Sequence, residues 1–237
     1  YGEASYNLTT ALKATAGLRW FHNGSVYADS QSGPFAGGGT VVTGPLKSDE
    51  RKATPKFVLS YKPGADALVY ASAAQGYRIG GPNVPNALDP AVPLRYRSDS
   101  LWNYELGVKT SWFDRHLTVN AALYYIDWTN IQIERTSAVN ALDYLDNGGK
   151  ASSKGIEIET IARPLKGLTF TSTLSLSRAR ARETIDGTLI RKGDRLPGSR
   201  DATLANSVEY QRAINDTLGL FVRADHQYSG KAYADFS

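Results

Sequence analysis

The sequence of 237 residues contains neither cysteine nor methionine. The lack of cysteine excludes disulfide bonds, thiolate catalysis and cysteine-bound metals. It also means that cysteine usage does not indicate whether the protein works in an oxidising or a reducing compartment. No run of about 18 consecutive apolar residues is present, which excludes a transmembrane helix. We expect no signal peptide within this stretch, because Tyr1 to Ala4 leads directly into a strand-like pattern. We therefore expect the chain to be an interior part of a longer protein.

The sequence also has no large excess of positive or negative charge. The 27 basic and 23 acidic residues give a net charge of +4, and they are scattered along the chain rather than clustered. A nucleic-acid partner is therefore not expected. His22, His116 and His226 lie far apart, so we expect no metal site, no cofactor and no enzymatic centre. The absence of long apolar runs does not exclude a membrane location, because a transmembrane β-barrel exposes apolar side chains only at alternate positions.

Residues 101–135 show the clearest pattern in the sequence, which is two long strands joined by a tight turn at Asp114-Arg115. Even positions of the first strand are mostly apolar and odd positions are polar or small, as in a strand with one apolar face. Trp102 and Trp112 open and close this strand. Ten residues of a tilted strand span roughly 25 Å, the height of the apolar band of an outer-membrane barrel. The pattern predicts strands that cross a membrane with aromatic rings at both rims.

Similar alternation predicts about nine strands in all. Besides the pair above, the predicted strands cover residues 4–21, 52–61, 67–78, 151–162, 168–176, 202–211 and a last strand from Leu218 towards Tyr233. Long connections are expected at 23–49, 79–99, 136–147 and 183–199, and short turns lie between them. The 23–49 loop is Gly-rich and contains Pro34 and Gly37 to Gly39.

The regular alternation of long and short connections is typical of outer-membrane barrels, which have short periplasmic turns and long extracellular loops. The aromatic residues expected at the membrane interfaces are Tyr6, Trp20, Trp102 and Trp112. Since no closing strand is visible, we predict an all-β fold: an incomplete segment of an antiparallel transmembrane β-barrel.

Four stretches of the chain resemble motifs of TonB-dependent outer-membrane receptors. They are Leu68–Ser72 running into Gln75–Gly81, Trp102–Lys109, Asn120–Trp128 with Ile131-Gln132, and Gly149–Glu159. Their shared order over residues 66–160 makes the resemblance specific. Near Leu196-Pro197-Gly198 the family often has a further proline where this chain has Ser199-Arg200, which affects only the expected loop shape.

The resemblance implies a barrel of about 22 strands whose lumen is filled by an N-terminal plug domain. Receptors of this kind lie in the outer membrane of Gram-negative bacteria and import ferric siderophores, haem, cobalamin or glycans with energy relayed by TonB. Residues 1–237 would form part of that single barrel domain, without the plug, the signal peptide, the TonB box or the closing strands. The implied partners are outer-membrane lipid, the TonB complex and a small-molecule nutrient such as a ferric siderophore.

Ligand contacts are expected at the outward loops, where Arg78, Asn83, Arg95, Tyr96 and Arg97 bracket the second long connection. Arginine and tyrosine suit an anionic, aromatic chelate such as a catecholate siderophore, through charge and stacking. The simpler interpretation of these residues is a solvated loop.

Residues expected to face the lumen are Glu105, Lys109, Glu157, Glu159, Arg223 and Asp225. They are interpreted either as a polar channel wall or plug-docking surface, or as charge ladders between neighbouring strands.

A possible ion site involves Asp143, Asp146 and Asn147, which carry the oxygen ligands that Ca²⁺ prefers. Their spacing fits no EF-hand, so solvated acids are the simpler interpretation.

The leading hypothesis is therefore a barrel segment of a receptor that binds and imports a scarce nutrient, most often an iron chelate. One alternative is a passive porin-like channel. The other is a soluble β-rich adhesin or carbohydrate-binding module, in which the Trp102 and Trp112 face would pack against a second sheet instead of lipid.

Overall fold

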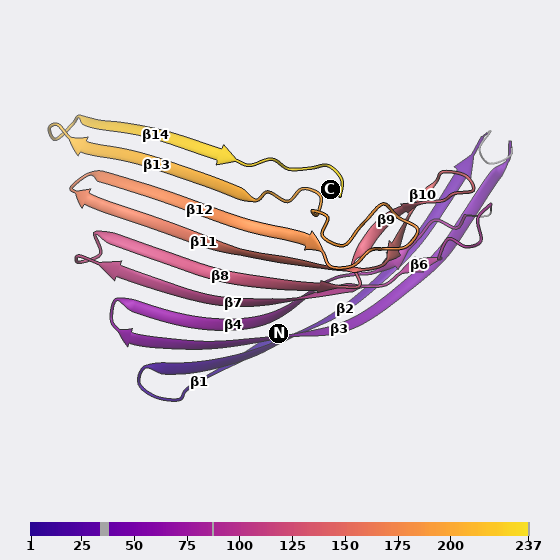
Figure 1. Cartoon of the computed structure of the whole chain (residues 1–237), viewed down its shortest axis with the longest axis horizontal. Helices are drawn as coiled ribbons and strands as arrows, with labels where there is room; N and C mark the ends of the chain where they lie inside the picture. The colour runs from indigo at the N-terminus through magenta and orange to yellow at the C-terminus, as the bar shows by residue number, and fades with distance from the viewer. Residues whose placement is uncertain (34–37, 87, 237) are drawn as a thin grey trace.

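The computed structural model of the chain describes residues 1–33, 38–86 and 88–236. Its main element is one antiparallel sheet of ten strands in the order β1-β2-β3-β4-β7-β8-β11-β12-β13-β14, and this sheet is curved and open (Figure 1). Its strands are β1 (Gly2–Asn7), β2 (Leu12–Ser32), β3 (Thr40–Gly64), β4 (Ala67–Arg78), β7 (Asp99–Trp112), β8 (Leu117–Thr129), β11 (Lys150–Leu165), β12 (Leu168–Ala181), β13 (Ala202–Ala213) and β14 (Gly219–Ser229). The predicted all-β antiparallel class is confirmed. Within the described residues there is no helix of the length and hydrophobicity needed to cross a membrane.

The sheet has one apolar and one polar face, because directly paired residues of neighbouring strands share a face. One row of pairs runs through Leu106, Leu123, Ile156 and Leu176. The next row joins Val108, Ala121, Ile158, Leu174 and Leu204. Leu106 and Leu123 are each 54% exposed, so no protein layer formed by the described residues covers this apolar face. An uncovered apolar sheet face matches the outer wall of a membrane barrel.

All short turns lie at one end of the sheet, here called the inner end, and the long connections lie at the other, the outer end (Figure 1). The predicted turn at Asp114-Arg115 is confirmed, and Phe113, Asp114 and Arg115 all adopt positive φ values of 53° to 66°. The predicted alternation of short and long connections therefore holds from β3 onward.

The first predicted strand, residues 4–21, is wrong in one respect, because a turn divides it into β1 and β2. Residues 8–11 contain neither glycine nor proline, so the turn left no obvious trace in the sequence. The Thr9 hydroxyl accepts hydrogen bonds from the backbone N–H of Ala11 at 3.2 Å and of Leu12 at 2.9 Å. A threonine side chain that caps its own turn replaces the usual turn residues.

Two predicted loops are partly wrong, since they contain paired strands. In the 23–49 stretch, β2 and β3 continue as a hairpin that extends beyond the rest of the sheet (Figure 1). Pro34 and Gly37 of this stretch lie outside the described residues. The 136–147 stretch includes β10 (Asp143–Asn147), which pairs with β9 (Gln132–Thr136). In both cases the two segments satisfy each other's backbone hydrogen bonds, which residue periodicity alone does not reveal. At the C-terminal end, β14 stops at Ser229, before the predicted end at Tyr233.

A small hydrophobic core lies at the outer end of the sheet. Its members are Ile131, Ile133, Ala151, Ala181, Ile185 and Ile190, with Trp128 and Leu196 packed against them. Ala151 pairs with both Trp128 and Ala181 in the sheet register. This row lies on the face opposite to that of Leu106. The long outer connections therefore fold over the polar face and bury apolar side chains there.

Candidate functional site

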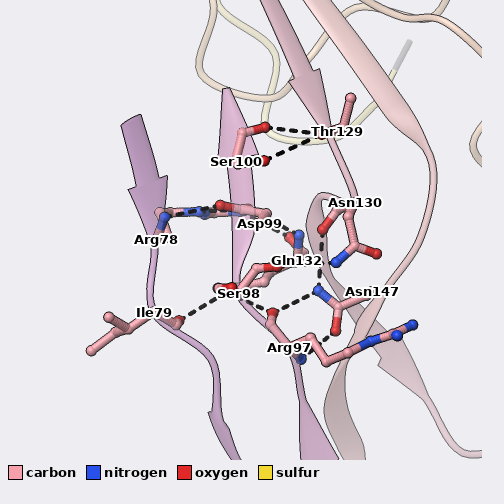
Figure 2. Close-up of polar contacts among 10 residues, drawn as sticks. All are labelled: Arg78, Ile79, Arg97, Ser98, Asp99, Ser100, Thr129, Asn130, Gln132 and Asn147. Carbon is pink, nitrogen blue, oxygen red and sulfur yellow. Dashed lines mark hydrogen bonds and ion pairs between the residues drawn. The ribbon is translucent and has the colours of Figure 1, made fainter. Parts of the chain in front are cut away.

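Asp99, at the start of β7, organises the outer end of the polar face (Figure 2). Its side chain is only 1% exposed. One carboxylate oxygen accepts from the Arg78 side chain (Nε at 2.9 Å, Nη2 at 2.5 Å) and the other from the Arg78 backbone N–H at 3.2 Å. The Gln132 backbone N–H adds a further bond of 3.2 Å. A buried carboxylate is stable only with such a full set of donors, so Asp99 joins β4, β7 and the β9–β10 hairpin.

Two amide side chains extend this arrangement, which we call the Asp99 network (Figure 2). Gln132 Nε2 donates to the carbonyl oxygens of Ile79 at 2.9 Å and of Arg97 at 3.2 Å. Asn147 Nδ2 donates to the carbonyl oxygens of Arg97 at 2.7 Å and of Asn130 at 3.1 Å. The network therefore holds the 79–98 connection against β9 and β10.

The predicted ligand residues occupy different environments. Arg78 lies in the Asp99 network, with its guanidinium 4.7 Å above the Trp128 ring, and half of its side chain stays exposed. Asn83 is 6% exposed, and its amide bonds to Pro93 and to both backbone groups of Leu145. Asn83 therefore holds the loop in place.

The other three candidates lie together on the strand-like segment that precedes Asp99. The Arg95 and Arg97 side chains are exposed, while the Tyr96 ring covers Gly81 in the short β5 (Gly81–Pro82) and β6 (Arg95–Tyr96) pair. The structure thus brings these residues to one loop at the outer end.

A cavity of about 1050 Å³ opens on the polar face beside the Asp99 network. Arg19, Lys56 and Arg78 contribute positive charge to its lining, and Glu3 contributes negative charge 3.9 Å from Lys56. Asp99 pairs with Arg78, and Glu3 lies close to Lys56. Within the described residues, the ion pairs of the structure do not include Arg19, so its positive charge leaves the cavity suited to an anionic group.

Aromatic rings alternate with the cations around this cavity. Phe21 lies under the Arg19 guanidinium at 4.4 Å and meets the Tyr77 ring edge-on at 5.0 Å. Lys52 lies 5.6 Å from the same Tyr77 ring and donates to the Ser98 hydroxyl at 3.3 Å. Such pairs offer both charge and a flat stacking surface to a ligand. Sequence reasoning missed Arg19, Phe21 and Lys52, although their positions on the polar phase of β2 and β3 would have indicated them.

The residues predicted to face the lumen share the polar face. Glu105, Lys109, Glu157 and Glu159 lie together in its middle, where Tyr70 donates a hydrogen bond to Glu105. Asn120 donates to Glu159 at 3.0 Å. The Tyr70 ring also lies directly against Gly107, where a Cβ atom would collide with it.

The last two lumen candidates lie on β14. Arg223 pairs with Asp225 at 2.9 Å and approaches Glu209 of β13 at 3.9 Å. The first contact joins two residues of β14, and the second is a cross-strand charge pair with β13.

The oxygen ligands considered for Ca²⁺ are held by protein groups. Asp143 accepts from the Thr136 hydroxyl at 2.7 Å, Asp146 pairs with Arg135 at 3.0 Å, and Asn147 belongs to the Asp99 network. Among residues 1–33, 38–86 and 88–236, no three His, Cys, Asp or Glu side chains gather as metal ligands.

The aromatic residues predicted at the membrane interfaces lie on the apolar face. Tyr6, Trp20 and Trp112 are 73%, 61% and 54% exposed. Trp102 stacks with Tyr104, with ring centroids 6.0 Å apart. These rings lie towards the two ends of the apolar rows, as amphipathic rings do at a membrane boundary.

Comparison with known proteins identifies the family. The family model described as TonB dependent receptor-like, beta-barrel matches residues 1–237. The chain is 31% identical over 163 residues to pesticin receptors of Yersinia enterocolitica and Yersinia pestis; the match covers 67% of this chain and 22% of those receptors. The chain thus spans about a fifth of the length of these relatives.

Solved structures show the same fold. The ferric yersiniabactin uptake receptor FyuA from Yersinia pestis has a TM-score of 0.80 at 23% identity, with 98% of this chain and 34% of that chain covered. The siderophore receptor PiuA from Acinetobacter baumannii has a TM-score of 0.68 at 16% identity, covering 97% of this chain and 33% of that one. The open sheet is therefore a part of a larger barrel, and the chain belongs to the family of TonB-dependent receptors of the Gram-negative outer membrane, within their β-barrel domain.

Proposed function

We propose that this chain is part of an outer-membrane receptor that imports an anionic metal chelate, with a ferric siderophore as its substrate. The observation that carries the proposal is the cavity at the outer end, where Arg19, Lys56 and Arg78 alternate with Phe21 and Tyr77. An aromatic chelate with negative charge would gain both ion pairing and stacking there. Family membership favours this receptor over the porin-like channel and the soluble module.

The exposed loop residues complete the proposed binding surface. Arg95, Tyr96 and Arg97 precede the Asp99 network, which fixes their backbone relative to the cavity. We assign the first encounter with the chelate to Arg95 and Arg97, and the deeper contact to the cavity. Asn83 and Asp99 act as positioning residues in this scheme, because their polar groups are engaged within the protein.

Import requires energy and a path through the lumen. We propose that TonB supplies the energy through a plug domain elsewhere in the protein. The carboxylates Glu105, Glu157 and Glu159 on the polar face would contact basic groups of that plug. Their net negative charge is suited to such a contact, and Lys109 alone does not neutralise it.

Uptake of radiolabelled iron by cells that carry the full-length receptor tests the proposal. The probes are a ferric tris-catecholate, ferric citrate and a ferric hydroxamate, each supplied with and without an uncoupler of the proton gradient. We expect uptake of at least one chelate, and its loss with the uncoupler. The double variant Arg19→Gln and Lys56→Gln should lower the apparent affinity by roughly 10-fold, as expected for the loss of one or two charged contacts.

The matched control is Arg115→Gln with Lys166→Gln, which removes the same charge at the inner turns. Equal uptake by the cavity variant and the control would reject the assigned binding surface. Uptake that persists with the uncoupler would reject active transport and favour a passive channel. No uptake of any of the three chelates would reject an iron chelate as substrate.

A further inference from the structure

Six cations gather at the outer end of the apolar face, on β11, β12 and the segment that follows them. They are Lys150, Lys154, Arg178, Arg180, Arg182 and Arg195, which we call the outer basic patch. Lys154 pairs directly with Arg178 in the sheet register, and Arg180 forms a β-bridge with Arg195. Paired residues share a face, so these side chains extend from the same surface as the leucines of the apolar rows.

The position of the outer basic patch follows from the register. The row of Leu106 and Ile156 is apolar, and the next row outward contains Tyr104, Tyr125, Lys154 and Arg178. The row beyond it contains Trp102, Asp127, Ser152 and Arg180. Tyrosine, tryptophan, lysine and arginine are the residues that extend from an apolar wall to the lipid headgroups. The outer basic patch therefore begins where the hydrocarbon ends.

Carboxylates balance only part of this charge. Asp127 pairs with Arg182, and Asp201 pairs with Arg195 and lies 3.9 Å from Arg180. Within the described residues, the ion pairs of the structure do not include Lys150, Lys154 or Arg178. The six cations thus face two carboxylates.

Repulsion among the cations of the outer basic patch is clearest at Arg180. Its side chain is 19% exposed, so burial acts against its charge most strongly, and Arg195 and Arg178 repel it while Asp201 attracts it. Cations held this close at a low-dielectric surface repel one another, so a bound anion would stabilise them.

The rest of the apolar face differs. The row from Trp112 through Leu117, Ala162 and Phe170 to Val208, near the inner end, contains no charged side chain. On the outer part of β2 and β3, Asp49 pairs with His22 at 2.6 Å and lies 3.6 Å from Arg51, and Lys47 is the next residue of the same strand phase. An unbalanced excess of cations on the apolar face is thus found at the outer end of β11 and β12.

We propose that the outer basic patch binds the phosphate groups of the phosphorylated glycolipid of the outer leaflet, lipid A. Phosphates of this lipid lie at the level where the patch begins, and arginine holds phosphate through paired, charge-assisted hydrogen bonds. Clusters of Lys and Arg beside a membrane wall recognise anionic headgroups in this way. The site goes beyond the proposed import function, because it depends only on the location of the barrel in the outer membrane.

Lipid binding to the full-length receptor, purified in a non-ionic detergent, tests the proposal. The probes are bis-phosphorylated lipid A, monophosphorylated lipid A and inorganic phosphate, and the readouts are native mass spectrometry and the thermal unfolding midpoint. We expect bis-phosphorylated lipid A to bind and raise the midpoint. It should bind at least 10-fold more weakly to the variant Lys154→Gln, Arg178→Gln, Arg180→Gln, and more weakly as salt rises.

The matched control carries Lys62→Gln, Arg115→Gln and Lys166→Gln, three equal charge changes at the inner end, and should bind lipid A as the wild type does. Heat-dependent mobility on a denaturing gel shows whether each barrel is folded. Should the triple variant fail to fold, the exposed single changes Lys154→Gln and Arg178→Gln replace it, each with an expected weakening of at least twofold. Equal lipid binding by patch and control variants would overturn the proposal. Inorganic phosphate that stabilises the protein as strongly as lipid A would show a free-anion site and also overturn it.

Discussion

The inner and outer ends of the same sheet are held together by different kinds of contact. At the inner end, connections such as residues 8–11 and 214–218 are closed by backbone hydrogen bonds between close neighbours in the chain. At the outer end, the connections meet one another: Asn83 bonds to Leu145, 62 residues away, and Asn86 exchanges amide hydrogen bonds with Asn140. The sheet thus has a locally determined end and an end assembled from distant segments, and ligand contacts are proposed at the assembled end.

The largest expected effect comes from Asp99→Ala, which would disrupt the assembled end. The change removes the acceptor of Arg78 and Gln132 and leaves their donors without a partner in a buried place. We expect the free energy of local opening at the outer end to fall by about 3 kcal/mol, as for the loss of a hydrogen-bonded buried charge. Hydrogen exchange of residues 79–98 and 130–149 in the full-length protein measures this change.

Asp99→Asn provides the graded comparison, because an amide keeps one acceptor oxygen but loses the charge. It should lie between the wild type and Asp99→Ala. Exchange at the inner turns should stay unchanged in both variants. Exchange that rises equally at both ends would contradict the separation of the two ends.

The next largest effect is expected at the inner end, from Gly167→Ala. Gly167 has φ of +84°, and an added Cβ would collide with the carbonyl oxygen of Gln211, whose N–H donates to Gly167 at 2.7 Å. A non-glycine residue whose backbone is in the left-handed conformation lowers the free energy of unfolding by about 1 to 2 kcal/mol. Urea unfolding followed by tryptophan fluorescence should show a loss of this size.

Gly64→Ala is the matched control near the inner end, since nothing lies within 4 Å of a Cβ built there. It should leave the unfolding midpoint almost unchanged. If Gly167→Ala behaved like this control, the inner turns would not depend on their local conformation as described.

The smallest effect is expected with pH, at the hairpin that β2 and β3 form beyond Trp20. A hydrogen bond from the His22 ring at 2.6 Å holds the pKa of Asp49 below its ordinary value of 3.8, and nearby Arg51 adds to this. A carboxyl with a lowered pKa stabilises the folded hairpin above its ordinary pKa, and this contribution is lost as the pH falls through the lowered value.

Hydrogen exchange of the hairpin, expressed as protection relative to the intrinsic amide exchange rate at each pH, should therefore show slightly lower protection below about pH 4 in the wild type. Asp49→Asn should flatten that dependence, while exchange at the turn of Lys166 and Gly167, which contains no acidic side chain, serves as an internal reference. An identical pH profile in the variant would show that the His22–Asp49 pair does not stabilise the hairpin.

Much of the fold could be predicted because membrane strands obey a local rule. The alternation from Trp102 to Trp112 predicts β7 within a few residues, and the turn after it is confirmed. The turn at Thr9 could not be predicted in this way, since a hydroxyl performs the role of a turn glycine. The outer part of β2 and β3 was missed because its pairing stabilises a stretch whose glycines suggest a loop.

The candidate site was predictable only in part. Arg78 could be found because it follows a recognisable strand and precedes a loop. Asp99 could not, because its role depends on Gln132, which reaches it from a hairpin 33 residues further along the chain. Arg19 and Lys56 were assigned to strands, but no sequence pattern showed that their side chains border one cavity.

Residue alternation and short turns predicted most strands of the main sheet, its two faces and the end at which the short turns lie. These features depend on side-chain alternation and on turns between neighbouring residues, so each can be read from a short window. Which loop residues are buried, which cations border the cavity and which form the outer basic patch became visible in the folded chain alone. These properties depend on the register between strands and on contacts between distant segments, which no short window contains.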